Sequence, residues 1–323
     1  MSELEPSQEA PIHAQSIVMS DLLPVASELV EAEAMDFSGA VREFKTSGWP
    51  EGYVYGATRY ADVIFRESFP ERFTDLITAL SEYRPTLDEL RAGGGGRTVF
   101  TKRFDDSLAA MLDDDSLSIW GKQNITIDKA VSLDGTPMRM SRTRGHEIDM
   151  FGKGTAEEPI PGIAVEMEWN NKDPFYDRDL INFQALHHEG VIAIGVIVTR
   201  GPRLQSLIGP TIRSKDGGLK FGQSTTHWSK LIPKVNLGGG GECPLLLIGI
   251  EPERIDGVEL AVSVQDGLRE VARWEQKERV AKAWKTRGQT YRDWQADLRA
   301  RKDAVLNLMP PLTEVTADRG DDD

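Results

Sequence analysis

Apolar and polar residues alternate strictly in one stretch near the middle of the chain, residues 162–170. Successive side chains of a β-strand point to opposite faces of the sheet, so this alternation predicts a strand with two unlike faces. The apolar positions are Ile163, Val165, Met167 and Trp169, and the positions between them are Ala164, Glu166, Glu168 and Asn170. The predicted strand therefore has one apolar face and one face that carries two carboxylates and an amide.

A second alternating stretch, residues 146–151, precedes the first. Its period places Ile148 and Met150 on one face and Glu147 and Asp149 on the other. Between the two stretches lie the turn formers Gly152, Gly154, Pro159, Pro161 and Gly162. Turn formers between two strands predict a β-hairpin, in which Asp149 lies close to Glu166.

The pattern after the hairpin predicts a helix and then a buried strand. Residues 178–188 have apolar positions at helical spacing, with Asp177 at the N-cap position and Gly190 as a stop signal. Residues 191–199 are almost wholly apolar, as expected of a strand covered on both faces, and residues 245–250 form another apolar strand. This order predicts an α/β (α+β) fold, with a central mixed β-sheet flanked by helices.

Weaker signals fill the remaining sequence. Helices are predicted at residues 22–34, 60–80 (interrupted near Pro70), 104–112 and 265–306, a strand within residues 120–131, and loops at residues 48–60 and 200–223. The region 265–306 carries charges of both signs. It is interpreted as a solvated helix pair that either packs on the core or serves in dimerisation.

We expect one domain at residues 20–310, with a core at about 140–250 and a C-terminal helical region at about 258–308. Residues 1–19 are polar and predict a disordered extension, and residues 311–323 predict a mobile acidic tail. The single cysteine, Cys243, excludes an intrachain disulfide and a cysteine-based zinc site. No stretch is apolar for long enough to span a membrane, and the N-terminus lacks a signal-peptide pattern, so a cytoplasmic protein is expected.

The net charge of −14 argues at first against a nucleic-acid partner. Binding depends on local charge, however, and a protein that contacts phosphates needs cations only at those contacts. Part of the acidic excess lies in residues 113–115 and in the tail. The basic residues around the predicted core are Arg139, Arg142, Arg144, Arg200, Arg203, Arg213, Lys215 and Lys220.

The acidic residues of the hairpin suggest metal chemistry. Neighbouring carboxylates repel one another unless a cation lies between them, and Mg²⁺ prefers such oxygen ligands. Asp149 and Glu166 are the predicted ligands, and Glu168 remains to hold or deprotonate a water, as phosphodiester hydrolysis requires. Taken alone, a Glu-x-Glu sequence is more often an ordinary solvated strand face.

These residues also resemble a known family. Asp149 followed by Glu166-Met167-Glu168 is similar to the D…ExK/ExE active site of the PD-(D/E)xK nucleases. The continuation WNNKD at 169–173, FYDRDL at 175–180, VTR at 198–200, STTHW at 224–228, the glycines at 238–241 and Cys243-Pro244 resembles the BglII/BamHI branch of type II restriction endonucleases. The resemblance covers about residues 144–250. Most of the superfamily has Lys where this chain has Glu168, which leaves open whether Glu168 is a base or a second-metal ligand.

The resemblance implies a restriction-endonuclease-like core and an Mg²⁺-dependent enzyme. Such an enzyme would act as a homodimer on a short palindrome in double-stranded DNA, within a restriction-modification system. It also implies that an upstream acidic residue can join the metal site, for which Asp128 and Asp134 are candidates. Base contacts are implied at Asn170 and Asn171, just past the second strand.

Other candidate DNA contacts follow from side-chain chemistry, because amides, hydroxyls and Arg read base edges and bind phosphates. They are Ser224, Thr225, Thr226, His227, Arg200 and Arg203. Two alternatives stay open at this point. One is a nuclease of the same core with a repair or structure-specific role, and the other is a non-catalytic DNA- or protein-binding module whose acidic strand is only surface.

Overall fold

The computed structural model describes residues 40–45, 47–92, 97–113, 116–155, 157–214, 217–309 and 312. The predicted N-terminal extension, the helix at 22–34 and the acidic tail, apart from Leu312, lie outside the described residues. Within the described part, no helix combines the length and the apolar composition needed to cross a membrane.

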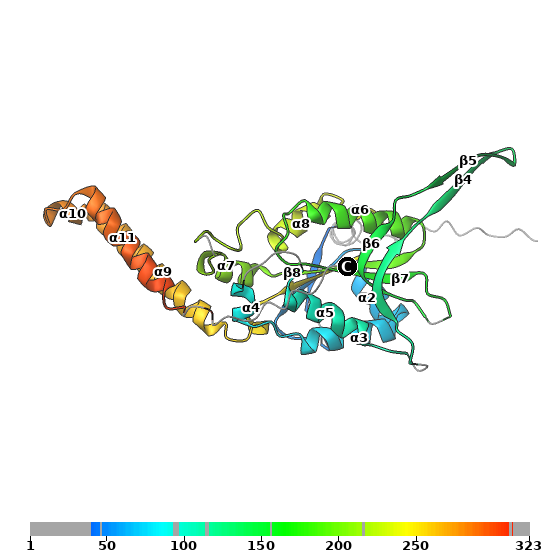
Figure 1. Cartoon of the computed structure of the whole chain (residues 1–323), viewed down its shortest axis with the longest axis horizontal. Helices are drawn as coiled ribbons and strands as arrows, with labels where there is room; N and C mark the ends of the chain where they lie inside the picture. Colours follow the sequence, from blue (N-terminus) through cyan, green and yellow to red (C-terminus); the bar gives the residue numbers. More distant parts are fainter. Residues whose placement is uncertain are drawn as a thin grey trace, which may run out of the picture. The chain divides into compact units, whose positions relative to one another are not determined.

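A mixed sheet forms the centre of the fold (Figure 1). It has seven strands, in the order β1-β2-β9-β8-β7-β6-β3. Its strands are β1 (Arg42–Phe44), β2 (Tyr53–Ala57), β3 (Trp120–Ile125), β6 (His146–Gly152), β7 (Gly162–Glu168), β8 (Ile192–Arg200) and β9 (Leu245–Ile250). Strands β7, β8 and β9 are parallel, and every other pair in this sheet is antiparallel. The predicted mixed sheet flanked by helices is confirmed.

Helices cover both faces of this sheet. One face packs on α2 (Ala61–Ser68), α3 (Pro70–Glu82), α4 (Leu87–Arg91), α5 (Val99–Ala109) and α7 (Pro202–Thr211). The other face packs on α6 (Phe175–His188) and α8 (Trp228–Asn236). Because β8 and β9 are buried on both faces, their sequences are continuous apolar runs rather than alternating ones.

The predicted hairpin is present, since β6 and β7 pair antiparallel with Met150 opposite Val165. One detail of the prediction was wrong. Ile148 packs with the α6 and α8 side of the sheet, whereas Met150 packs on the opposite side. The cause is an irregularity in the pairing of β3 with β6, where Gly121 and Gln123 face Phe151 and Ile148. The extra residue in β6 breaks the strict alternation.

The start of α6 and the region after β8 also differ from the sequence prediction. Helix α6 begins at Phe175 with Pro174 at the N-cap, so Asp177 lies in its first turn instead of capping it. Gly190, with φ of +70°, does follow the end of this helix. The region predicted as a loop after β8 contains α7, because Pro202 starts a helix whose Leu204, Leu207 and Ile208 are buried.

Strand β2 lies within residues 48–60, which were also predicted as a loop. A separate two-stranded sheet is formed by β4 (Asp128–Leu133) and β5 (Thr136–Arg142), whose residues are all exposed. The C-terminal region contains α9 (Glu259–Ala281), α10 (Ala283–Thr286) and α11 (Tyr291–Leu306). Gly288, with φ of +70°, lies between α10 and α11.

Candidate active site

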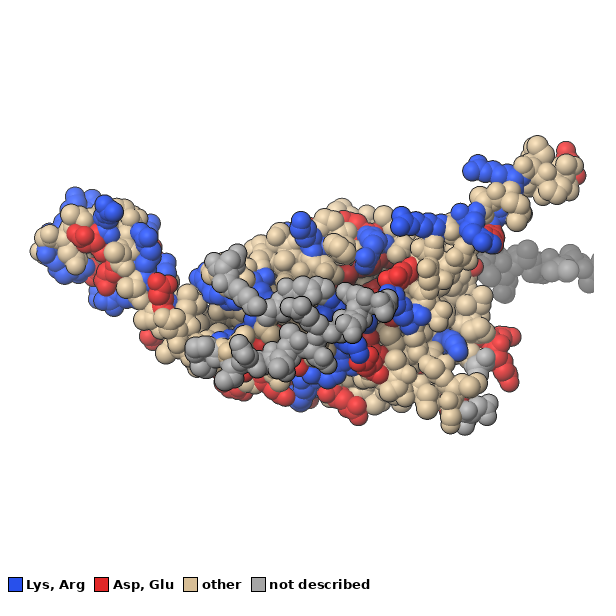
Figure 2. Space-filling model, in the orientation of Figure 1, with Lys and Arg blue, Asp and Glu red and all other residues tan. Residues whose placement is uncertain are grey.

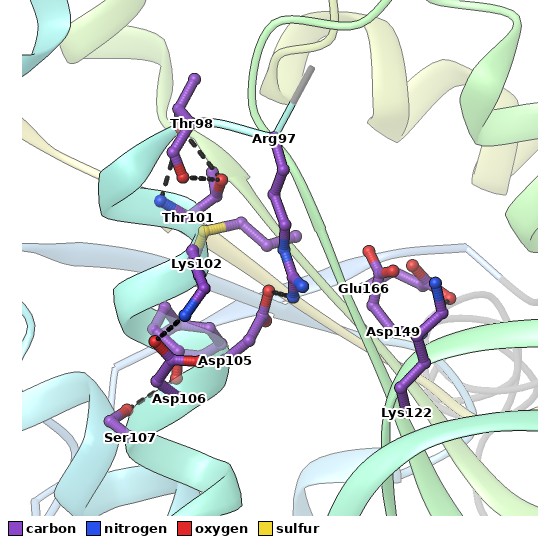
Figure 3. A network of polar contacts seen from close by, with 12 residues as sticks. Arg97, Thr98, Thr101, Lys102, Asp105, Asp106, Ser107, Lys122, Asp149 and Glu166 are labelled. Atoms are coloured by element: carbon purple, nitrogen blue, oxygen red, sulfur yellow. Dashed lines mark hydrogen bonds and ion pairs between the residues drawn. The ribbon is translucent and has the colours of Figure 1, made fainter. Parts of the chain in front are cut away.

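The β6–β7 pairing brings Asp149 and Glu166 together, as the sequence predicted. The backbone N–H of Asp149 donates a 3.2 Å hydrogen bond to Oε1 of Glu166. In Figure 3 the two carboxylates point toward one another across the neighbouring strands. The pairing therefore gathers two acidic side chains that are 17 residues apart in the sequence.

Glu166 is nearly inaccessible to solvent, with 3% of its surface exposed. Burial, followed by the charges of Asp149 and Asp179, raises the pKa of its carboxyl well above the usual value. Both effects disfavour a second negative charge at this place. A negative charge on Glu166 is therefore unfavourable unless a positive charge lies beside it.

Glu168 lies two residues further along β7 and is also 3% exposed. Its Oε2 accepts a 2.7 Å hydrogen bond from the side-chain amide of Asn171, and its Oε1 lies 3.5 Å from the guanidinium of Arg178. Burial and the carboxyl of Asp179 raise the pKa of Glu168 to about 8. The structure thus places Glu168 next to the candidate base contact Asn171.

The backbone of Glu168 is held by a buried chain of hydrogen bonds. The Thr199 hydroxyl of β8 donates a 2.7 Å hydrogen bond to the Glu168 carbonyl, and the Tyr176 hydroxyl of α6 lies 2.6 Å from the Thr199 hydroxyl. All three residues are buried. These hydrogen bonds connect the end of β7 to β8 and to α6. They fix the position of the Glu168 backbone, from which the side chain extends.

A third acidic neighbour, Asp179 on α6, was not singled out from the sequence. It is 1% exposed, and its Oδ1 accepts a 2.8 Å hydrogen bond from Nε of Arg178. Its Oδ2 is buried and has no hydrogen-bond partner among the described residues. The sequence does contain a signal for Asp179, which shares the apolar face of α6 with Tyr176 and Phe183. Carboxylates are rare on a buried helix face unless they have a partner.

These residues suit a hard divalent cation. No three acidic, histidine or cysteine side chains of the described residues converge as a complete metal cage. Mg²⁺, however, is commonly held by one or two carboxylates and fills its remaining positions with water and substrate phosphate. Asp149 and Glu166 are two adjacent carboxylates, and burial together with the charges of Asp149 and Asp179 raises the pKa of Glu166.

The two groups of predicted DNA contacts lie side by side next to this site. The Thr226 N–H donates a 2.8 Å hydrogen bond to the Asn171 carbonyl, and the Asp173 N–H donates a 3.1 Å hydrogen bond to the Ser224 carbonyl. A bridge between Lys172 and Thr225 links the same two segments. Asn171 and Ser224 are exposed, whereas Asn170 and Thr225 are partly buried.

Three other predicted contacts are buried instead. Arg200 has no exposed surface, and its guanidinium donates to Gln205, Thr225 and the Thr226 carbonyl. Thr226 is 0% exposed and His227 is 3% exposed. Direct contact of these three side chains with a base or a phosphate would require a rearrangement that exposes them.

The remaining candidates have different surroundings. Arg203 is exposed but forms a bidentate pair with Glu253, at 2.6 and 2.7 Å. Asp128 is similarly paired with Arg142 on β4 and β5, and Asp134 lies in the turn of that hairpin with φ of +47°. The carboxylate of Asp179 lies close enough to Glu166 and Glu168 to raise the pKa of both.

Residues 53–250 match the family model described as restriction endonuclease BglII/BglIII. The match runs from the start of β2 to the end of β9 and includes the whole candidate site. No curated protein sequence matches the chain significantly.

Proposed function

The chain belongs to the BglII/BglIII family of restriction endonucleases and is therefore a type II site-specific DNA endonuclease, and we propose that its cleavage of double-stranded DNA depends on Mg²⁺ held by Asp149 and Glu166. The observation that carries this proposal is the contact between the Asp149 backbone and the buried Glu166 carboxylate. Both residues lie at the centre of the family match. The pair offers oxygen ligands in a place where uncompensated negative charge is unfavourable.

Glu168 is proposed to orient or deprotonate the attacking water. A general base works best when its pKa is near the operating pH, and the pKa of about 8 in the metal-free protein meets that condition. Asn171 donates a hydrogen bond to one oxygen of this carboxylate, and the Arg178 guanidinium lies beside the other oxygen. When bound, a divalent cation would lower the pKa of a water and offset charge on the phosphate.

The surface formed by Asn170, Asn171, Ser224 and Thr225 is proposed to contact DNA. Exposed amides and hydroxyls can donate to and accept from base edges. Arg200 is proposed to support this surface from below, because it holds Thr225 and Thr226 in place. Arg203 is proposed to reach phosphate only if its pairing with Glu253 opens.

We further propose a homodimer that cuts both strands of a short palindrome, because two copies related by a twofold axis match the symmetry of such a site. A role in a restriction-modification system would require host protection by methylation. It would also place the enzyme in the cytoplasm, where invading DNA arrives.

The test uses the full chain, unmethylated DNA and Mg²⁺. Discrete fragments that share one short palindrome at their ends are expected from the wild-type protein and not from Glu166→Gln. The matched control is Glu158→Gln, an exposed carboxylate in the turn that joins the same two strands. Random fragmentation would refute sequence specificity. Equal cleavage by Glu166→Gln would refute the assigned metal ligand.

A further inference from the structure

The C-terminal helical region carries a charge opposite to that of the whole chain. It consists of α9, α10 and α11 and lies outside residues 53–250, so the family match assigns nothing to it. Residues 259–306, from the start of α9 to the end of α11, contain eleven Lys or Arg and eight Asp or Glu, a net charge of +3, in a chain whose net charge is −14. Figure 2 shows Lys and Arg side chains over the visible face of this region. Its basic residues are thus concentrated rather than scattered.

Six of these cations are exposed and form no ion pair with any described residue. They are Arg273, Lys277, Lys282, Lys285, Arg292 and Arg299. The other basic side chains of the region are engaged, for example Arg287 with Glu278 and Arg279 with Glu275. Lys282, Lys285 and Arg292 lie where α9 gives way to α10 and α11. Their charges therefore face solvent without a neutralising partner.

The matched part of the chain offers fewer free cations than its sequence suggests. Arg200 is buried, Arg203 is paired with Glu253, and Arg142 is paired with Asp128. Lys220 donates to the carbonyls of Leu90 and Ala92. A nuclease with a large negative net charge needs unpaired cations where DNA phosphates lie, because releasing counterions from phosphates supplies much of the binding free energy.

The helices that present these charges have a packed interior of their own. Trp284 and Trp294 are buried with ring centroids 4.9 Å apart, and Trp274 stacks on Trp294 at 6.5 Å. Near its start, α9 is anchored by the buried Ala261 and Val264 and by a hydrogen bond from Gln265 to the Ser206 carbonyl. The exposed cations contribute nothing to this packing, so they can be replaced without disturbing it.

We propose that the exposed face of α9–α11 binds the phosphate backbone of double-stranded DNA, independently of sequence. The inference rests on the proposed function, because the duplex is the substrate of the candidate active site. Unpaired Lys and Arg on a helical surface match the charge of phosphates, and they carry no base-reading geometry. The region thus adds affinity and salt dependence, whereas specificity stays with the loops beside Glu168.

The test measures binding of the full chain to two labelled duplexes, with and without the cleavage site, in the absence of divalent cation. The variant replaces three exposed cations, Lys282→Gln, Lys285→Gln and Arg292→Gln. The affinity for both duplexes is expected to fall at least about tenfold at roughly 0.1 M salt, and the slope of log K against log salt to fall by about 2–3. The ratio between the two duplexes should not change.

The control also removes three exposed cations, Lys45→Gln, Arg66→Gln and Lys102→Gln, of which Arg66 and Lys102 are paired with Glu67 and Asp106. Equal losses in the two triple variants, or an unchanged salt slope in the first, would overturn the inference. Loss of dimers by the first variant in sedimentation, with an unchanged salt slope, would also overturn the inference. The face would then join two copies of the chain. Cleavage is assayed separately, so site-specific cutting with an unchanged slope would remove this inference and leave the proposed function standing.

Discussion

The side-chain amide of Asn171 donates a 2.7 Å hydrogen bond to Oε2 of Glu168. Asn171 is exposed and belongs to the loop proposed to contact bases, whereas Glu168 is buried at the end of β7. The same loop is held by the Thr226 N–H through the Asn171 carbonyl. A single residue therefore connects the proposed recognition surface with the proposed water-positioning carboxylate.

Asn171→Ala is expected to reduce kcat more than it reduces DNA affinity. The variant leaves the cations intact but releases one oxygen of Glu168, and misplacing a group that acts on the water costs about 10²-fold in rate. Single-turnover cleavage and metal-free binding are measured on the same duplex. Loss of affinity with an unchanged single-turnover rate would show that Asn171 only reads DNA. Asn170→Ala, which removes an amide with no bond to Glu168, is the control.

The hairpin that forms the site could be predicted because its signal is local. Strict alternation over β7 determines which side chains share a face, and the Gly and Pro residues before Gly162 determine where the chain reverses. The closeness of Asp149 and Glu166 follows from these two features. The irregularity in β6 could not be predicted, because it depends on the pairing with β3, 20 to 30 residues earlier in the sequence.

Burial separates residue type from accessibility at other positions. Arg200 was a reasonable DNA contact by residue type, yet its position at the end of a strand covered on both faces puts it beneath Thr225 and Thr226. Asp179 lies between Arg178 and the apolar Leu180 near the start of α6, and the sequence alone does not show which way its carboxylate faces. Only the docking of α6 on β7 turns Asp179 toward Glu168. Sequence indicates which residue types are present, but tertiary packing decides which of them face solvent.

Arg200→Met is expected to destabilise the fold by about 2–4 kcal/mol, because it leaves the buried Thr226 carbonyl and the Gln205 side chain without their donor. Arg66→Met is the control. Its surface pair with Glu67 contributes within about 1 kcal/mol. Urea unfolding of both variants measures the difference. Equal stability, together with a selective loss of DNA binding in Arg200→Met, would contradict a supporting role for Arg200.

The stability of the protein is expected to rise between about pH 8 and pH 10.5, relative to a Lys220→Met variant. Burial lowers the pKa of Lys220 from 10.5 to about 8. In this window the unfolded chain keeps the proton and the folded chain releases it, so the unfolded state binds more protons and stability increases with pH. Below about pH 8 the difference between the two proteins should be constant. The free energies of unfolding of both are measured across this range, and a parallel pH dependence would refute the prediction.

Glu166→Gln is expected to stabilise the metal-free protein by about 1–3 kcal/mol, while abolishing its stabilisation by Mg²⁺. The amide keeps the size of the side chain and removes a charge that burial, Asp149 and Asp179 all disfavour. Thermal unfolding is followed in chelator and in Mg²⁺ for the wild type, for Glu166→Gln and for Glu158→Gln. In Mg²⁺ the wild type and Glu158→Gln should unfold at a higher temperature than in chelator, and Glu166→Gln should not. A Glu166→Gln protein that is less stable than the wild type in chelator would mean that this carboxylate is already satisfied without a cation, and the argument for a metal at this position would fail.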